Sequence, residues 1–384
     1  MPNILQPSHQ RLRYDFVASV PLDLLNAMYF TFLAGELEGI EPWPIETRRR
    51  MDPALRAELD LLLSYPRQQP GIVGALNDTL FVHRSRIADI DSLLEFVRTM
   101  PAEGTESPHE PGIQGLAIYA LRWPGGQPFV LPAGMPARDA LAARLAGPPD
   151  DDLTTCAATA DIGGAKTVLA LFDDPEQVRA RLLALIRRFY DEHYRADEER
   201  RLACMQRSVA FHRDQPVRDV DGLLRALTGR HISCLQEVPA AYTDFVFVPS
   251  VDTGPYNSCA DLPPVHGLHY PCETRFTRED SAHPADDTHR IALVYRALGD
   301  EQRLQILRLL RDGELYATEI VERTGIHQSA VSRHLAFMKA VGLVNVRPQN
   351  NMKFYSLNSE ISRDLRHVVE LFVGAMPVAK GGTS

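Results

Sequence analysis

The chain has 384 residues, of which 45% are hydrophobic and 24% charged. This is the composition of a globular protein with two or three domains, and it excludes a disordered or fibrous chain. No apolar run approaches the ~18 residues that a membrane helix needs, and the N-terminus has no basic segment followed by an apolar one, as a secretory signal would. The five cysteines, an odd number, do not suit a disulfide framework. We therefore expect a cytoplasmic protein with no membrane partner.

The net charge of −9 is unevenly distributed along the chain. From residue 288 onward there are 13 Lys and Arg against 9 Asp and Glu, a balance of +4, whereas the preceding residues carry 28 against 41, a balance of −13. Local positive charge favours contact with phosphates. The sequence therefore favours a nucleic-acid-binding surface in the C-terminal part and disfavours a second one in the acidic remainder.

Helical periodicity dominates the first 230 residues. Residues 14–17 suit a short strand or an arm, and 112–120 form an apolar segment of uncertain type. Asp52 and Pro53 form a typical helix start, and Asp89 or Asp91 provides a cap for a later helix. Apolar spacing of three and four residues predicts helices over 21–39, 53–65, 71–82, 87–100, 136–146, 175–212 and 217–228.

The longest of these helices, over 175–212, allows two interpretations. It is either a spine or dimer helix that joins two halves of the protein, or a surface helix of the N-terminal domain. After it, the periodicity changes to that of strands, and a small antiparallel sheet is expected. Its strands are predicted over 231–235, 243–248 and 267–276, with a loop over 249–264 between the last two.

Two short helical patterns near the C-terminus meet at a glycine. The first covers 317–324, and Gly325 follows it where a helix C-cap favours positive φ. The second covers 328–341. Its apolar face contains Val331, Leu335, Met338 and Val341, and its opposite face carries Gln328, Ser329, Ser332, Arg333 and Ala336. A helix-turn-helix with short polar side chains and one arginine on the open face is suited to a DNA major groove.

A hairpin pattern follows the second helix. Residues 343–347 alternate apolar and polar, 348–351 have turn chemistry, and 353–357 form the return strand. Arg347 and Lys353 flank the tip, where cationic side chains can reach backbone phosphates. The hairpin is therefore predicted to be the wing of a winged helix.

The C-terminal part resembles the winged helix of the ArsR/SmtB family of transcriptional regulators, in the segments LGDEQRLQILRLL, HQSAVSRHL, AVGLV and KFYSL. The resemblance covers roughly 288–373, under a quarter of the chain. It departs from the family at Gln302, where a proline is usual, and at Asn350, where the wing tip usually has glycine. The resemblance implies a homodimer held by the helices over 291–298 and 359–373, and it implies DNA contacts from Gln328, Ser329, Ser332, Arg333 and His334.

Together these features predict a mainly α (α+β) protein. An α-rich regulatory or dimerisation domain is expected over 1–277, a linker over 278–287, a winged helix over 288–376 and a tail over 377–384. The complete set of predicted DNA-contacting residues is Gln328, Ser329, Ser332, Arg333, His334, Arg347, Asn350 and Lys353.

A cluster of Cys and His gives an alternative, because the family includes metal sensors and zinc takes such ligands in sets of four. The residues are Cys259, His266, His269 and Cys272. Their spacing matches no standard motif, so the leading expectation is no metal. The positions that carry a Cys-x-Cys in metal sensors are Tyr316 and Thr318 here. On the C-terminal helix, Asp364, His367 and Glu370 share a face but lack the rest of the sensor pattern.

Catalytic motifs give little support for an enzyme. The segment 161–167 hints at a phosphate loop, but Ala165 interrupts the required Gly-Lys-Thr. The sequence therefore predicts a non-enzymatic, cofactor-free regulator that binds double-stranded DNA as a homodimer. We expect a repressor that reads an inverted repeat, with an N-terminal domain that senses a small-molecule effector or a partner. A metal-responsive regulator and a catalytic N-terminal domain are the alternatives.

Overall fold

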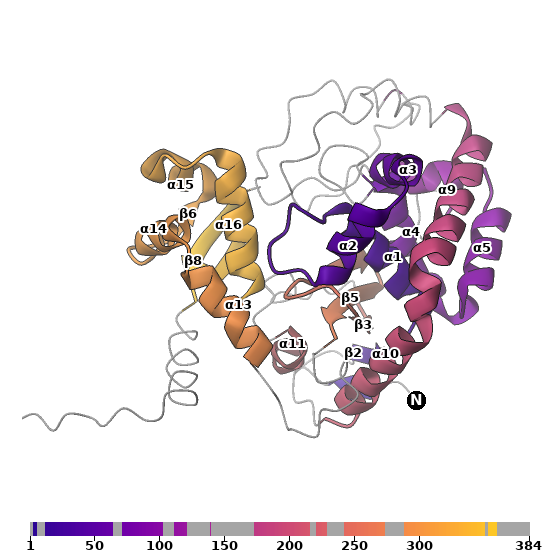
Figure 1. The fold of residues 1–384 in the computed structure, drawn as a ribbon. Coiled ribbons are helices and arrows are strands. Elements are labelled where there is room, and N and C mark those ends of the chain that lie inside the picture. The colour runs from indigo at the N-terminus through magenta and orange to yellow at the C-terminus, as the bar shows by residue number, and fades with distance from the viewer. Residues whose placement is uncertain are drawn as a thin grey trace, which may run out of the picture.

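The computed structural model describes residues 3–5, 12–63, 71–102, 111–120, 139, 173–215, 220–228, 242–272, 288–349 and 352–358. Figure 1 shows a larger N-terminal region, in indigo to salmon, beside a smaller body in orange and yellow. We call the described residues of 3–272 the N-terminal region and those of 288–358 the winged helix. Among the described helices, none combines the length and apolarity needed to cross a bilayer.

A five-stranded sheet forms the centre of the N-terminal region. Its order is β1-β2-β3-β5-β4. Strand β2 pairs parallel with β3, and β3 pairs parallel with β5, while the two outer pairs are antiparallel. The strands are β1 (Asn3–Leu5), β2 (Leu12–Phe16), β3 (Asp244–Ser250), β4 (Ser258–Leu262) and β5 (Val265–Pro271).

The mixed sheet corrects two expectations. The predicted antiparallel sheet is wrong for the β3–β5 pair, which is parallel because the chain between these strands passes through β4 and then returns as β5. The β2–β3 pair was not part of the predicted sheet and is also parallel, and the more than 200 residues between these strands supply the crossover that parallel strands need. The predicted loop over 249–264 contains β4, which pairs with β5 by an antiparallel register from Ser258–His269 to Leu262–Val265. The strand predicted over 243–248 is confirmed as β3, and the one over 231–235 lies outside the described residues.

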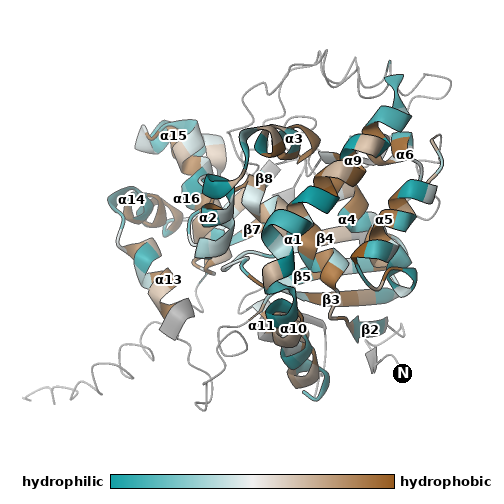
Figure 2. Cartoon of the chain, turned by 45° about the vertical axis from the view of Figure 1, so that its right-hand side comes forward, coloured by the Kyte–Doolittle hydropathy of each residue, from teal (hydrophilic) through white to brown (hydrophobic). Residues whose placement is uncertain are grey.

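Both faces of β3 are buried, as expected for a parallel strand covered by helices on each side. Val246 and Val248 face one core, whereas Phe245 and Phe247 face the other. Figure 2 shows α1 (Val20–Phe32) and α4 (Gly71–His83) on one side of the sheet and α10 (Glu198–Arg213) and α11 (Val220–Thr228) on the other. The valines of β3 therefore pack in the core with α1 and α4, and its phenylalanines pack in the core with α10 and α11.

The first face is covered by helices whose positions follow the predicted periodicity closely. Ser19 caps the first of them, and the predicted cap Asp89 accepts from the Ser92 amide at 2.8 Å. The helices predicted over 21–39, 53–65, 71–82 and 87–100 are confirmed with shifted ends, and 112–120 is helical. These helices are α1 (Val20–Phe32), α3 (Pro53–Leu63), α4 (Gly71–His83), α5 (Ile90–Thr99) and α6 (Ile113–Ala120).

One helix of this region has no counterpart in the prediction. Helix α2 (Pro42–Arg50) begins with two prolines, which suit the first turn of a helix. The short turn η1 (Arg84–Arg86) is also new. The helix predicted over 136–146 lies outside the described residues, apart from helical residue 139.

The long helical segment belongs to the N-terminal region and packs there. It consists of α9 (Pro175–Phe189), a π-helical turn η2 (Tyr190–Tyr194), a short turn η3 (Arg195–Asp197) and α10 (Glu198–Arg213). Its first half joins the core above the sheet through Val178, Leu182 and Phe189. Its second half joins α11 (Val220–Thr228) below the sheet through Val209. Within the described residues it packs in the N-terminal region, which agrees with the second interpretation, and a role as a dimer helix stays a prediction.

The C-terminal body has the predicted winged-helix architecture with its own core. A three-stranded sheet of order β6-β8-β7 closes against the helices. The elements are α13 (Thr288–Leu298), α14 (Glu301–Leu310), β6 (Leu315–Tyr316), α15 (Ala317–Thr324), α16 (Gln328–Ala340), β7 (Val344–Gln349) and β8 (Met352–Leu357). The predicted mainly α fold with a C-terminal winged helix-turn-helix is thus confirmed.

Candidate nucleic-acid interface

The turn between α15 and α16 has the predicted geometry. Gly325 has a φ of 69° and its amide donates to the carbonyl of Val321 at 2.9 Å, which ends α15 in a left-handed cap. The predicted apolar face of α16 is buried in the winged-helix core at Val331, Leu335 and Met338. These contacts fix the rotation of α16 about its axis and hence which side chains face outward.

The start of α16 has a residue that the sequence analysis missed. His327 is the N-cap: its Nδ1 accepts from the Ser329 amide at 3.3 Å and lies 2.8 Å from the Ser329 hydroxyl. The sequence signal was its position directly before the helix, where a side-chain acceptor satisfies a free amide. His327 therefore orients the hydroxyl of Ser329, one of the predicted DNA contacts.

Three of the predicted contacts on α16 are accessible. Gln328 and Arg333 are exposed, and Ser329 is half-buried. Within the described part of the chain, no carboxylate forms an ion pair with the exposed guanidinium of Arg333. The amide and the guanidinium can each make two hydrogen bonds to one base edge. The N-terminal half of α16 thus presents the chemistry of direct base readout.

Two of the predicted DNA contacts are buried. Ser332, predicted on the open face, is only 5% exposed, and His334, which the resemblance assigns to DNA, is only 8% exposed. His334 Nε2 lies 2.9 Å from the side-chain oxygen of Gln302 on α14. Because an amide oxygen only accepts, the imidazole donates this bond. Burial lowers the pKa of His334, and the nearby Arg303 and Arg333 act in the same direction against Asp300 and Glu38. The ring is therefore held neutral against the next helix and is turned away from the open face.

The wing carries a cation that is already engaged. Arg347 on β7 donates to Glu314 at 2.6 Å, and its guanidinium lies 5.2 Å from the ring centroid of Phe354 on β8. Lys353 on β8 is half-buried. The predicted contact Asn350 lies outside the described residues. Arg347 thus reaches the wing surface, but a phosphate has to compete with the carboxylate of Glu314 for it.

The four candidate metal ligands are not brought together. His266 and His269 lie on the same strand, β5, three residues apart, so their side chains leave opposite faces of the sheet. His266 contacts the rings of Tyr242 and Phe245 on one face. His269 on the other face lies 3.2 Å from Asn77.

Both ring nitrogens of His269 have protein partners, since Nε2 lies near Asn77 and Nδ1 near Ser250. Its Nδ1 lies 3.3 Å from the Ser250 hydroxyl, and burial lowers the pKa of His269 to about 3. Among the described residues, no group of three or more Cys, His, Asp and Glu has the spacing of a metal site. The segment 161–167 and the triad Asp364, His367 and Glu370 lie outside the described residues.

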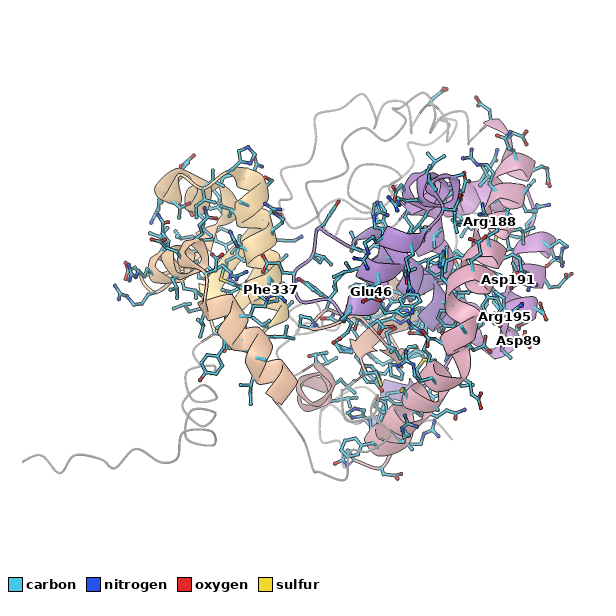
Figure 3. All side chains as sticks on the ribbon, in the orientation of Figure 1. Glu46, Asp89, Arg188, Asp191, Arg195 and Phe337 are labelled. Atoms are coloured by element: carbon cyan, nitrogen blue, oxygen red, sulfur yellow. The ribbon has the colours of Figure 1, made fainter. Side chains whose placement is uncertain are left out.

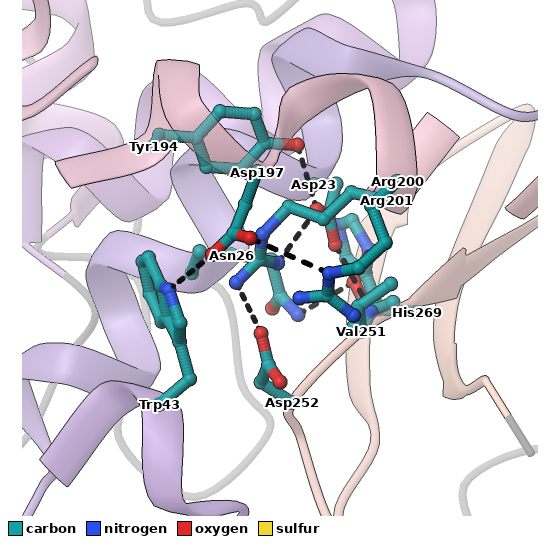
Figure 4. A network of polar contacts seen from close by, with 12 residues as sticks. Asp23, Asn26, Trp43, Tyr194, Asp197, Arg200, Arg201, Val251, Asp252 and His269 are labelled. Atoms are coloured by element: carbon teal, nitrogen blue, oxygen red, sulfur yellow. Dashed lines mark hydrogen bonds and ion pairs between the residues drawn. The ribbon is translucent and has the colours of Figure 1, made fainter. Parts of the chain in front are cut away.

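A buried polar network occupies the N-terminal region where β3 ends (Figure 4). Asp23, in the first turn of α1, accepts from Tyr194 at 2.7 Å, from Arg201 at 3.1 Å and from the Val251 amide at 3.1 Å. Arg201 also pairs with Asp252 and lies 4.2 Å from the ring centroid of Trp43. The network ties α1, α2 and α10 to the chain that leaves β3. The sequence analysis gave no sign of it, because its members come from four distant segments.

Comparison with known proteins places the C-terminal body in a family. Residues 300–346 match the model of the arsR family of bacterial regulatory proteins. The transcriptional activator HlyU of Vibrio cholerae is 38% identical over 82 residues, which cover 21% of this chain and 73% of HlyU. The transcriptional repressor SdpR of Bacillus subtilis is 31% identical over 71 residues, covering 18% of this chain and 79% of SdpR.

A solved structure shows a similar match. The homodimeric winged helix-turn-helix DNA-binding domain Mb0332 of Mycobacterium bovis is 30% identical, and the match covers 24% of this chain and 89% of that domain with a TM-score of 0.20. The family match and the identity to HlyU coincide with the glycine turn, the buried face of α16 and the wing. The chain therefore belongs to the ArsR family and is a winged helix-turn-helix transcriptional regulator.

Proposed function

We propose that this protein is a sequence-specific transcriptional repressor that reads an inverted-repeat operator as a homodimer. The observation that carries this proposal is the accessible N-terminal half of α16, with Gln328 and Arg333 exposed beside a hydroxyl that His327 orients. In the major groove, glutamine pairs with an adenine edge and arginine with a guanine edge. Acting on chromosomal DNA, the protein works in the cytoplasm.

The wing supplies phosphate contacts that position α16. Arg347 lies on β7 and Lys353 on β8. Arg347 pairs with Phe354 and Pro348 pairs with Lys353, so the two cations occupy neighbouring pairs of the wing. Cations at this place contact the sugar-phosphate backbone and set the orientation of the protein without reading bases. Ser332 and His334 have no direct part in base readout, because they are buried.

An apolar surface on the winged helix supports the homodimer. Tyr295 on α13 and Leu304 on α14 are 42% and 41% exposed, two of the three large hydrophobic side chains that stand out among the described residues. Ile291 and Leu298, half-buried, lie on the same face of α13 as Tyr295, at spacings of four and three. Two copies joined through this face place their recognition helices about 34 Å apart, one turn of the DNA duplex.

The N-terminal region is the sensor in this proposal. It has its own sheet and cores, and it is joined to a DNA-binding body that is complete without it in the relatives. An effector or partner alters DNA affinity only if it binds two states of the protein with different affinity. A metal ion as effector has no support from the placement of His266 and His269 on opposite faces of β5.

The proposal is tested by the affinity of the purified protein for the DNA upstream of its own gene. Fluorescence anisotropy over a salt series, with and without chelator, measures specific and nonspecific binding. Arg333→Ala is expected to weaken specific binding by about 5- to 100-fold, because a guanine contact is lost. Arg308→Ala is the matched control, since Arg308 is an exposed arginine on α14, and it leaves binding unchanged. Equal binding by both variants contradicts the assignment of α16.

A further inference from the structure

The N-terminal region touches the winged helix through a short segment that precedes α2. Glu38 in this segment forms an ion pair with Arg303 on α14 at 2.7 Å. The next residue, Gly39, packs against Phe337 on α16 and Leu293 on α13. Figure 3 shows Phe337 on the side of the winged helix that faces the N-terminal region. We call residues 38–40 the wedge.

The wedge fits its site too closely for a larger side chain. Gly39 has a φ of 78°, and a Cβ at this position would lie 2.6 Å from Cε2 of Phe337 and 3.2 Å from Cδ2 of Leu293. Positive φ disfavours side chains in any case. Glycine is therefore required at residue 39 both by its backbone conformation and by the ring of the recognition helix.

On the winged-helix side, the wedge contacts the guanidinium of Arg303, which has several other partners. The guanidinium of Arg303 donates to the carbonyls of Ala297 and Arg296, each at 2.9 Å, and lies 5.1 Å from the ring centroid of Phe337. Glu38 completes this arrangement by accepting from the remaining nitrogen. Arg303 thus links the end of α13, the C-terminal half of α16 and the wedge in one buried contact.

On the other side, the wedge is held by the turn between β3 and β4. The hydroxyl of Tyr256 donates to the carbonyl of Glu38 at 2.7 Å. Gly254, with a φ of 60°, packs directly against the carbonyl of Gly39. The same turn begins at Asp252, which pairs with Arg201 in the buried network. A continuous set of contacts therefore runs from the polar network through the turn and the wedge to α16.

We propose that the wedge is the element through which the N-terminal region controls the recognition helix. The docked wedge holds the C-terminal half of α16 in place before DNA is bound, so that less ordering is needed on binding. Displacement of the β3–β4 turn releases the wedge and lowers DNA affinity. The effect on DNA rests on the proposed function, whereas the hold on α16 does not.

Three substitutions in the full-length protein test the wedge. Glu38→Gln removes the charge of the ion pair with little change in shape, Tyr256→Phe removes one hydroxyl, and Gly39→Val forces the wedge away from Phe337. Glu58→Gln is the matched control, because Glu58 pairs with Arg181 at 2.7 Å entirely within the N-terminal region. The first measurement is amide hydrogen exchange of residues 328–340 without DNA.

Exchange in the C-terminal half of α16 is expected to rise by about twofold to fivefold in Glu38→Gln and Tyr256→Phe, and by about tenfold or more in Gly39→Val. The control matches the wild type. Anisotropy with operator DNA is expected to show weaker binding in the same order. Unchanged exchange in all three variants overturns the proposal, and so does faster exchange with unaltered DNA affinity. If the wild type binds no DNA, the proposed function fails, while hydrogen exchange still decides whether the wedge holds α16.

Discussion

His334 of the recognition helix lies 2.9 Å from Gln302 at the start of α14, so its ring points into the winged helix and away from the groove-facing side. Gln302, one of the two residues that depart from the family pattern, is thus the hydrogen-bond partner of a residue that the family resemblance assigned to DNA. This pair ties α16 to α14 by a polar contact beside the apolar core.

The first prediction concerns this pair. Gln302→Ala is expected to lower the free energy of unfolding by about 1–2 kcal/mol, because it leaves a mostly buried imidazole N–H without an acceptor. Gln305→Ala is the control: Gln305 is an exposed glutamine on the same helix with a longer bond of 3.4 Å to Thr324, and a change below about 0.5 kcal/mol is expected. Urea unfolding followed by circular dichroism measures both, and equal losses would contradict the role of the bond.

The second prediction concerns the wing. Glu314→Gln removes the carboxylate that competes with phosphate for Arg347, so DNA binding is expected to strengthen and the slope of log K against log salt to steepen by about 0.9 for one added contact. Asp312→Asn removes the same charge two residues away, where it pairs with Arg311 on the surface. This control shifts affinity slightly at low salt and leaves the slope unchanged. A slope in Glu314→Gln that equals that of the control argues against a phosphate contact from Arg347.

The third prediction concerns the buried network. Asp23→Ala is expected to destabilise the protein by about 3–5 kcal/mol, because it leaves the buried cation of Arg201 with one fewer partner and deprives Tyr194 and the Val251 amide of their acceptor. Asp60→Ala breaks a partly exposed pair with Arg48 and costs about 1 kcal/mol. Denaturant unfolding compares the two variants. A loss at Asp23 no larger than that at Asp60 would show that Asp252 alone is a sufficient partner for Arg201.

The fourth prediction is a pH dependence. The pKa of His269 is lowered from 6.5 to about 3 by burial, and its ring partners Asn77 and Ser250 carry no charge. The neutral ring therefore supports folding above pH 6.5, and this support is lost as the pH falls toward 3. Relative to His269→Gln, the wild type is expected to lose about 2 kcal/mol of unfolding free energy between pH 7 and pH 5. Parallel stability curves for the two proteins over this range would refute the assignment.

The local sequence was sufficient to predict much of the fold. Caps such as Asp89, the left-handed Gly325 and the apolar spacing of Val331, Leu335 and Met338 depend on neighbours within a few turns, so helix positions and the winged helix follow from sequence alone. The unpredicted helix α2 and strand β4 are both short and rich in proline or loop-forming residues nearby, which masks their periodicity.

The candidate interface was only partly predictable, because local periodicity does not identify the helix that packs beside α16. Gln328 and Arg333 are exposed as expected, because periodicity alone separates them from the core face of α16. Ser332 and His334 occupy the border between the two faces, where a neighbouring helix decides burial. Periodicity does not identify that neighbour, and Gln302 lies 32 residues away in the chain.

The sequence by itself determined most of the described helices, the wing and the resemblance to the ArsR family, because each rests on a pattern within a contiguous segment. Only the tertiary structure decided that β2 lies parallel to β3, that Asp23 meets Arg201, and that Glu38 meets Arg303. Asp23 and Arg201 are 178 residues apart in the chain, and Glu38 and Arg303 are 265 residues apart. Contacts over such distances arise from the packing of whole layers against one another, and no local pattern encodes which layers will meet.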